Sequence, residues 1–387
     1  MEYIIIGNGV AGTEAAMTIR KNDSEGKIRI VSESQNMFYY RPRIIDFLAD
    51  EITAEKLTIY KDDFYEKKNI ECMLETKVLS IDAENKTVKL EGGENLKYDK
   101  LLLAPGANCF LPPINGSDKT GVFTLKSIQD GEKIKEYCAN IKSVIFIGGG
   151  LLGLETACSL LKPGQKGTII EFFPRLLPRQ LDKDGAAFLQ KRIEDERGLE
   201  FILGDSVEEI IGDGVVTGVK LKSGKEISCE AIIVSAGIRA RTELGESASL
   251  TIDRGILAND NLETSHVDIY CAGDALNHRG RTYGIWGPSK EQGKIAGLNM
   301  CGIETIYEGS TLSAKLKVSG HDLFSMGFDE KLELEELIHD GNDYYLKIFK
   351  SDGKIVGAIV IGSKEIADTA EKCSSGRCDY SELEKYI

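Results

Sequence analysis

Two glycine-rich stretches hold the residues whose types and spacing are best suited to chemistry. They read Gly7-Asn8-Gly9-Val10-Ala11-Gly12 and Gly148-Gly149-Gly150-Leu151-Leu152-Gly153, so both follow the pattern Gly-x-Gly-x-x-Gly. The first glycine permits a tight turn, the second lets a pyrophosphate approach the backbone, and the third lets helix and strand pack closely. The N–H groups and dipole of a following helix hold the negative charge. Each stretch therefore predicts a dinucleotide site, although a single copy is also typical of an ordinary α/β turn.

The elements that must position these glycines are also readable. Apolar runs at 3–6 and 144–147 predict a strand before each turn, and alanine-containing patterns predict a helix after it. In each copy a second strand ends in an acid, which is Glu33 after the first turn and Glu171 after the second. A carboxylate at about this distance is suited to bind ribose hydroxyls.

The whole unit occurs twice, which is the strongest organisational signal in the chain. The first copy continues through a meander with turns at Asn85 and Gly92-Gly93 to the apolar run that ends in Ala104-Pro105-Gly106. The second continues through turns at Asp213-Gly214 and Ser223-Gly224 to Ser235-Ala236-Gly237. An internal repeat of this kind predicts two dinucleotide sites, between which electrons pass.

Composition limits the alternatives. With 387 residues, 42% hydrophobic and 28% charged, the chain is expected to be a globular protein of two or three domains. We expect no membrane span and no signal peptide, and hence a cytoplasmic protein. The net charge of −14 argues against nucleic acid or an anionic membrane as partner. The nine cysteines are expected to be mainly reduced core thiols.

The last third of the sequence differs from the repeat. A short strand ends in Ala272-Gly273-Asp274, and 290–300 reads as a helix. Alternating runs after residue 305 predict an antiparallel meander packed on a helix. Cys373 and Cys378 are expected to be free thiols on a flexible tail, with a mobile redox pair or a metal site as alternatives. The four histidines form no metal or triad pattern and are expected on the surface or in loops.

The order of these motifs resembles the pyridine nucleotide-disulfide oxidoreductase superfamily over essentially the whole chain. Within this superfamily, three segments look like the corresponding segments of the NADH:rubredoxin reductases: 38–43, 179–185 and 316–320. The resemblance implies an α/β, glutathione-reductase-like fold with two Rossmann-like domains and a small α+β C-terminal domain. The FAD-binding domain would comprise 1–108 and 240–304, the NADH-binding domain 109–239, and the C-terminal interface domain 305–387.

The resemblance also assigns the cofactors FAD and NADH to particular residues. Glu33 would bind the adenosine ribose of FAD, Val78 the adenine, Asp274 the ribitol or pyrophosphate, and Arg41, Trp286 and Gln292 would lie near the flavin. The remaining FAD contacts would be Gly7, Gly9, Val10, Ala11, Gly12, Ala104, Gly106, Lys126 and Gly273. The NADH contacts would be Gly148, Gly150, Leu152, Gly153, Glu155, Glu171 and Gly237.

Glu171 predicts a preference for NADH, because a carboxylate there repels the 2′-phosphate of NADPH. Arg175 and Arg179 keep some use of NADPH open. In the family the position of Glu155 reaches toward the nicotinamide.

Several departures from the family are informative. Many members carry Ala-Thr-Gly where this chain has Ala104-Pro105-Gly106, and Arg-Thr where it has Lys126-Ser127. The Pro-Asn that usually follows the glycine of the second domain is replaced here by Arg239-Ala240-Arg241. Disulfide reductases of the superfamily carry cysteines near the flavin, yet residues 1–71 contain none. Electrons are therefore expected to leave the flavin directly, with no catalytic acid–base residue and no metal.

The expected partner is a small electron-carrier protein, rubredoxin first. A ferredoxin-type reductase, the flavin module of a nitrite reductase, an NADH oxidase and a redox-sensing flavoprotein remain alternatives; the nitrite case would be marked by a long iron–sulfur and sirohaem module. Because such carriers are acidic, we expect them to bind at a basic part of the surface. The window 277–294 predicts such a landing site, since basic residues outnumber the acidic Glu291 around Trp286. The basic residues are Arg279, Arg281, Lys290 and Lys294. Monomer and dimer both stay open.

Overall fold

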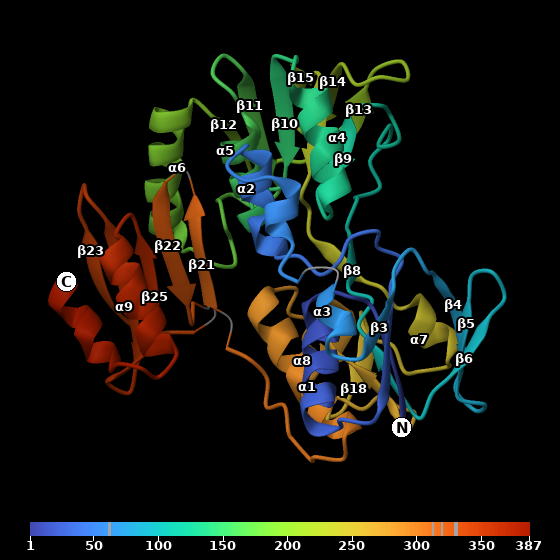
Figure 1. Cartoon of the computed structure of the whole chain (residues 1–387). Coiled ribbons are helices and arrows are strands. Elements are labelled where there is room, and N and C mark those ends of the chain that lie inside the picture. Colours follow the sequence, from blue (N-terminus) through green and yellow to red (C-terminus); the bar gives the residue numbers. More distant parts are fainter. Residues whose placement is uncertain (61–62, 312, 319, 329–331) are drawn as a thin grey trace. The chain divides into compact units, whose positions relative to one another are not determined.

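The computed structural model describes residues 1–60, 63–311, 313–318, 320–328 and 332–387 (Figure 1). The chain divides into two compact units. The first comprises Met1–Ile44, Ile52–Asn108 and Ile238–Ser310, and the second comprises Ile45–Glu51, Cys109–Gly237 and Thr311–Ile387. Each unit contains one of the two glycine turns.

The first unit is built on a parallel sheet in the order β19-β7-β1-β2-β3. Its central strand is apolar and buried, as a parallel sheet covered on both faces requires. The strands are β1 (Glu2–Ile6), β2 (Lys27–Val31), β3 (Ile70–Met73), β7 (Lys100–Leu103) and β19 (Ile269–Cys271). The expected meander is an antiparallel sheet of β4 (Val78–Asp82), β5 (Thr87–Leu90) and β6 (Asn95–Lys97).

Helices α1 (Val10–Asn22) and α8 (Trp286–Met300) of this unit pack closely together. A Cβ on Gly293 would lie 2.2 Å from the carbonyl oxygen of Ala11, and one on Gly297 would lie 2.9 Å from that of Ala15. Glycine at these positions therefore lets the two backbones approach. Helix α8 begins at Trp286, one turn before the start expected from the sequence.

The second unit repeats the parallel sheet, in the order β12-β11-β10-β16-β9. Equivalent bonds join the two copies: the Gly7 amide donates to the Val31 carbonyl and the Gly148 amide to the Ile170 carbonyl, both at 2.8 Å. The predicted repeat is therefore confirmed. The strands are β9 (Val122–Thr124), β10 (Ser143–Ile147), β11 (Lys166–Glu171), β12 (Glu200–Leu203) and β16 (Ala231–Val234). An antiparallel sheet follows from β13 (Val207–Ile211), β14 (Gly218–Leu221) and β15 (Glu226–Ser228).

The C-terminal part of the second unit is an antiparallel sheet in the order β21-β22-β25-β24-β23, covered by α9 (Figure 1). This confirms the expected meander on a helix. The elements are β21 (Ser313–Val318), β22 (His321–Met326), β23 (Glu335–Asp340), β24 (Tyr345–Ser351), β25 (Lys354–Ile361), α9 (Lys364–Ser374) and the 3₁₀ helix η4 (Tyr380–Tyr386). Of the motif 316–320, Ser319 lies outside the described residues.

The remaining helices and strands complete both units. They are η1 (Arg41–Arg43), α2 (Ile44–Leu48), η2 (Ala54–Leu57), α3 (Asp63–Glu66), β8 (Ala107–Cys109), α4 (Ile128–Cys138), α5 (Leu151–Leu160), α6 (Lys183–Arg197), β17 (Ile238–Ala240), α7 (Glu243–Ser247), β18 (Ile256–Ala258), η3 (Gly273–Ala275) and β20 (Leu276–His278). No helix within the described ranges is long and apolar enough to cross a membrane.

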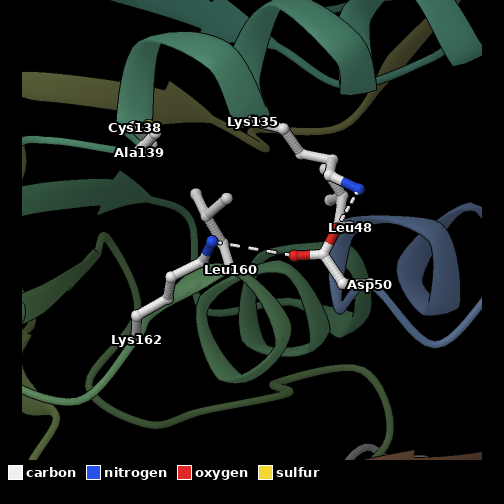
Figure 2. Close-up of a pocket in the computed structure, with 7 residues that line it drawn as sticks. All are labelled: Leu48, Asp50, Lys135, Cys138, Ala139, Leu160 and Lys162. Atoms are coloured by element: carbon white, nitrogen blue, oxygen red, sulfur yellow. Dashed lines mark ion pairs between the residues drawn. The ribbon is translucent and has the colours of Figure 1, made fainter.

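The segment 45–51 clusters with the second unit, whereas the sequence placed it with the first. Its Phe47 ring contacts Gly131 of α4, and Lys135 of the same helix binds Asp50 at 2.5 Å. Figure 2 shows Asp50 between Lys135 and Lys162 at a small pocket. Burial raises the pKa of the Cys138 thiol there to about 12, so this thiol stays protonated. The ion pairs of Asp50 thus attach the segment 45–51 to α4 and to Lys162.

The cysteines correct one expectation. Cys373 and Cys378 are joined by a disulfide that closes the end of α9, so they are not free thiols. Cys373 is buried at the end of α9, whereas Cys378 is half-buried. The seven other cysteines are free, as expected.

Candidate functional site

The first glycine turn forms a cradle that only glycine can build. Gly7 has φ +107°, and a Cβ on it would lie 2.1 Å from the carbonyl oxygen of Ala104. A Cβ on Gly12 would lie 2.0 Å from the carbonyl oxygen of Gly7. By contrast, a Cβ on Gly9 would meet no described atom within 4 Å. Gly9 directly precedes α1, so it leaves open space beside the first N–H groups of this helix, where a pyrophosphate can be held.

A second turn adjoins this cradle. Gly273 has φ +81°, and a Cβ on it would lie 3.2 Å from the Ala11 side chain. Its amide donates to Gln292 of α8 at 2.9 Å, and the Ser289 hydroxyl donates to Asp274 at 3.2 Å. Helix α8 therefore holds the Gly-Asp turn against the N-terminus of α1.

Gln292, predicted near the flavin, connects two segments of the first unit. Its side chain is 1% exposed, and its amide nitrogen donates to the Tyr307 hydroxyl at 3.1 Å. Both ends of the amide are thus engaged within the protein. The structure assigns Gln292 to supporting Gly273, and the sequence offered no signal for this pairing.

The predicted adenosine contacts come together beyond the end of β2. Glu33 follows this strand and forms an ion pair with Arg241. The amide of Thr76 donates to the Ser32 carbonyl at 2.9 Å, which brings Val78 alongside. Arg241 was not predicted as a site residue, because it lies 208 positions from Glu33.

The predicted flavin-side residues also meet. Trp286 stacks on Phe38 with ring centres 5.7 Å apart and contacts the edge of Tyr40 at 4.7 Å. The Arg41 guanidinium lies 5.6 Å from the centre of the Tyr39 ring. The N-terminus of α8 and η1 thus form one aromatic and basic surface of the first unit.

The second glycine turn repeats the first cradle in the second unit. Gly148 has φ +112°, and a Cβ on it would lie 2.6 Å from the Ser235 carbonyl oxygen. A Cβ on Gly153 would lie 2.0 Å from the Gly148 carbonyl oxygen, while one on Gly150 would meet no described atom within 4 Å. The Ser235 hydroxyl is buried and has no hydrogen-bond partner among the described residues. Together with Leu152 at the start of α5, this arrangement fits a second dinucleotide; Gly237, with φ +106°, closes the following loop.

Glu171 organises the loop beside the second turn. Its buried carboxylate accepts hydrogen bonds from the amide of Gly149 at 2.5 Å and from that of Phe173 at 2.9 Å. Arg175, in contrast, donates to the carbonyls of Leu181 and Pro178. These two hydrogen bonds brace the loop that follows β11.

Glu155 lies on α5, in the turn after Gly153. Burial raises the pKa of its carboxyl group to about 7, and the charge of Asp46 adds to the effect. The group therefore changes its charge near neutral pH. Such a carboxyl can respond to a cofactor that binds beside it.

The Glu155 carboxyl should make stability depend on pH. Because its pKa is raised on folding, its contribution is fully present below about pH 4.5 and is lost as the pH rises through about 7. Glu155→Gln is therefore expected to be more stable than the parent at pH 8 by roughly 1–3 kcal/mol, but not at pH 4.5. Thermal unfolding at both pH values measures the difference. Glu132→Gln, an exposed control on α4, should show no such dependence; equal behaviour of both variants would contradict the assignment.

Other predicted residues are placed as follows. The backbone amide of Lys126 donates to Asp130 at 3.0 Å at the start of α4. His278 is buried rather than on the surface, with its Nε2 atom 2.9 Å from Asp260. Within the described residues no group of three or more metal-ligating side chains is present.

Comparisons with known proteins agree with this geometry. The family described as pyridine nucleotide-disulphide oxidoreductase matches residues 1–294, and the rubredoxin NAD⁺ reductase C-terminal domain matches residues 313–373.

Among curated relatives, an NAD(P)H nitrite reductase of Bacillus subtilis is 36% identical over 391 residues, covering 99% of this chain and 48% of the relative. The NADH-rubredoxin oxidoreductase of Clostridium acetobutylicum is 32% identical over 373 residues, covering 96% and 93%. The chain thus spans about half the length of the first relative and nearly all of the second.

Solved structures are similar over the whole chain. The NADH:rubredoxin oxidoreductase from Clostridium acetobutylicum has a TM-score of 0.81 at 30% identity, with 98% of this chain and 96% of that chain covered. An NAD-dependent persulfide reductase from A. fulgidus has a TM-score of 0.91 at 27% identity, with 97% and 76% covered.

Proposed function

We propose, for a chain that belongs to the pyridine nucleotide-disulphide oxidoreductase family, that it passes electrons from NADH through FAD to a small one-electron carrier protein, rubredoxin first. The first cradle would hold FAD and the second NADH. The observation that carries the proposal is the repeated cradle, in which both turns present an open glycine to the start of a helix. Two dinucleotides in one chain are suited to exchange electrons.

The protein's own part in this reaction is to bind and align. Bound FAD supplies the hydride and single-electron chemistry. In the first unit, Gly9 and the start of α1 would hold its pyrophosphate, Asp274 its ribitol or pyrophosphate, and Glu33 its ribose. In the second, Glu171 would accept hydrogen bonds from the ribose of NADH, which supports a preference for NADH over NADPH.

The exit route for electrons rests on a sequence fact. Residues 1–71 contain no cysteine, so the flavin-side dithiol of disulfide-reducing members has no counterpart there. We therefore propose direct transfer from the flavin to the carrier. A second candidate is delivery to a nitrite-reducing centre, favoured by the 36% identity to the Bacillus subtilis nitrite reductase.

Anaerobic stopped-flow spectroscopy tests the function. FAD-loaded protein is reduced with NADH, and rubredoxin, ferredoxin, flavodoxin, nitrite and oxygen are then offered separately. We expect rapid reduction and the fastest reoxidation by rubredoxin. Slow reduction by NADH would instead indicate a sensor, and fastest reoxidation by oxygen an oxidase.

The structure changes the composition of the proposed landing site. Arg279 makes a double hydrogen bond to Asp260 at 2.9 and 2.6 Å, so its charge is neutralised locally. Lys290 and Lys294 are exposed and follow Trp286 at four-residue spacing along α8, and the Tyr40 contact brings Arg41 and Arg43 near. We define the basic patch as Arg41, Arg43, Arg281, Lys290 and Lys294.

Reversing charge on this patch should affect the carrier alone. Arg281→Glu with Lys290→Glu is expected to raise KM for rubredoxin about tenfold at low salt and to weaken its salt dependence, because steering acts through exposed charge. KM for NADH should not change. The matched control is Lys89→Glu with Lys97→Glu, which makes the same charge change on the exposed β5–β6 hairpin of the same unit. Equal effects of the two pairs would exclude the patch.

A further inference from the structure

The stretch Arg239-Ala240-Arg241 stands where many family members carry Pro-Asn, and Arg241 is the residue that the fold puts to use. Its guanidinium forms an ion pair with the carboxylate of Glu33, the residue proposed to bind the adenosine ribose of FAD. The side chains are 24% and 45% exposed. The contact therefore lies at the surface of the first unit, beside the first glycine turn.

Both partners are anchored to the backbone around that turn. The Arg241 amide donates to the Gly106 carbonyl at 3.0 Å, in the turn between β7 and β8. On the other side, the Ser32 hydroxyl donates to the Oδ1 atom of Asn8 at 2.8 Å, and the Nδ2 atom of Asn8 donates to the Asn36 carbonyl at 2.8 Å. The loop containing Glu33 is thus tied directly to the turn, and Arg241 is aimed at it.

We propose that Arg241 is a positioning residue for the adenosine half of FAD: it orients the Glu33 carboxylate so that this group accepts hydrogen bonds from the ribose hydroxyls. An exposed ion pair contributes little to folding because water screens it. Once bound adenosine excludes water, the same pair interacts more strongly. Arg241 thus contributes to FAD affinity and little to the stability of the apoprotein. The proposal rests on the assignment of the first cradle to FAD.

Titration of FAD-stripped protein with FAD, followed by flavin fluorescence, tests this. Arg241→Gln is expected to raise the Kd for FAD about tenfold, which corresponds to about 1.4 kcal/mol. ADP carries the adenosine but no flavin. Its affinity, measured by competition with FAD, should fall by the same factor. The Tm of the apoprotein should not change, and Arg241→Lys should restore part of the affinity. Arg254→Gln, which removes an exposed charge paired with Asp253 in the same unit, should leave the Kd unaltered.

A double-mutant cycle tests whether Arg241 acts through Glu33. Adding Arg241→Gln to Glu33→Gln should cause little further loss of FAD affinity. An unchanged or tighter Kd in Arg241→Gln would overturn the proposal, as would additive losses in the cycle or a fall in apoprotein Tm that accounts for the loss. If the parent protein itself failed to bind FAD, the proposed function would fail first.

Discussion

Replacing Glu171 with alanine is expected to lower kcat/KM for NADH about a hundredfold, which equals about 2.7 kcal/mol. The carboxylate holds the amides of Gly149 and Phe173, and hydrogen bonds to a charged group contribute about 1.5–3 kcal/mol each. Its removal frees the loop beside the second glycine turn and also removes the proposed ribose contact. The value of kcat/KM for NADPH should fall less, because the carboxylate no longer repels the 2′-phosphate of NADPH.

Steady-state kinetics with both nucleotides measure this effect. The control is Glu200→Ala, at the amino end of the neighbouring parallel strand β12, whereas Glu171 lies at the carboxyl end of β11. It should leave both values of kcat/KM unchanged. If Glu171→Ala lowered kcat/KM equally for NADH and NADPH, the residue would have a structural role only, and the preference for NADH would have another cause.

Replacing Gly293 with alanine is expected to have the largest effect on the first unit. The new methyl group would lie 2.2 Å from the carbonyl oxygen and 2.8 Å from the Cα atom of Ala11, both backbone atoms of α1. Helices α1 and α8 would have to separate, at a cost of about 3 kcal/mol or more. Because Ala11 also adjoins Gly273, the first cradle, proposed to hold FAD, would open at the same time, and bound flavin should be lost.

The same substitution at Gly287 is the matched control. Gly287 is the second residue of the same helix, and a Cβ there would meet no described atom within 4 Å. Alanine has a higher helix propensity than glycine, so Gly287→Ala should leave the apoprotein Tm unchanged or raise it. Thermal unfolding of the apoproteins and flavin content after purification compare the two. A harmless Gly293→Ala would show that the helices tolerate separation.

The features that sequence reasoning predicted correctly share short spacing and a fixed local geometry. Gly7 and Gly148 must each turn the chain between a strand and a helix within a few residues, so their pattern is written in consecutive positions. The repeat of strand, turn and helix, the two meanders and the C-terminal sheet follow from periodicities of this kind. These local rules were enough for the fold class and for both cradles.

The tertiary structure alone decided which distant side chains meet. Arg241 reaches Glu33 across 208 residues, Arg279 forms an ion pair with Asp260, and Gln292 supports Gly273. The disulfide was equally hidden, since Cys-x4-Cys is compatible with free thiols as well as with a bond. Such pairings depend on where the whole chain brings its backbone, which no local pattern encodes. The local sequence therefore determines the glycine turns, whereas the tertiary structure determines which side chains lie beside them.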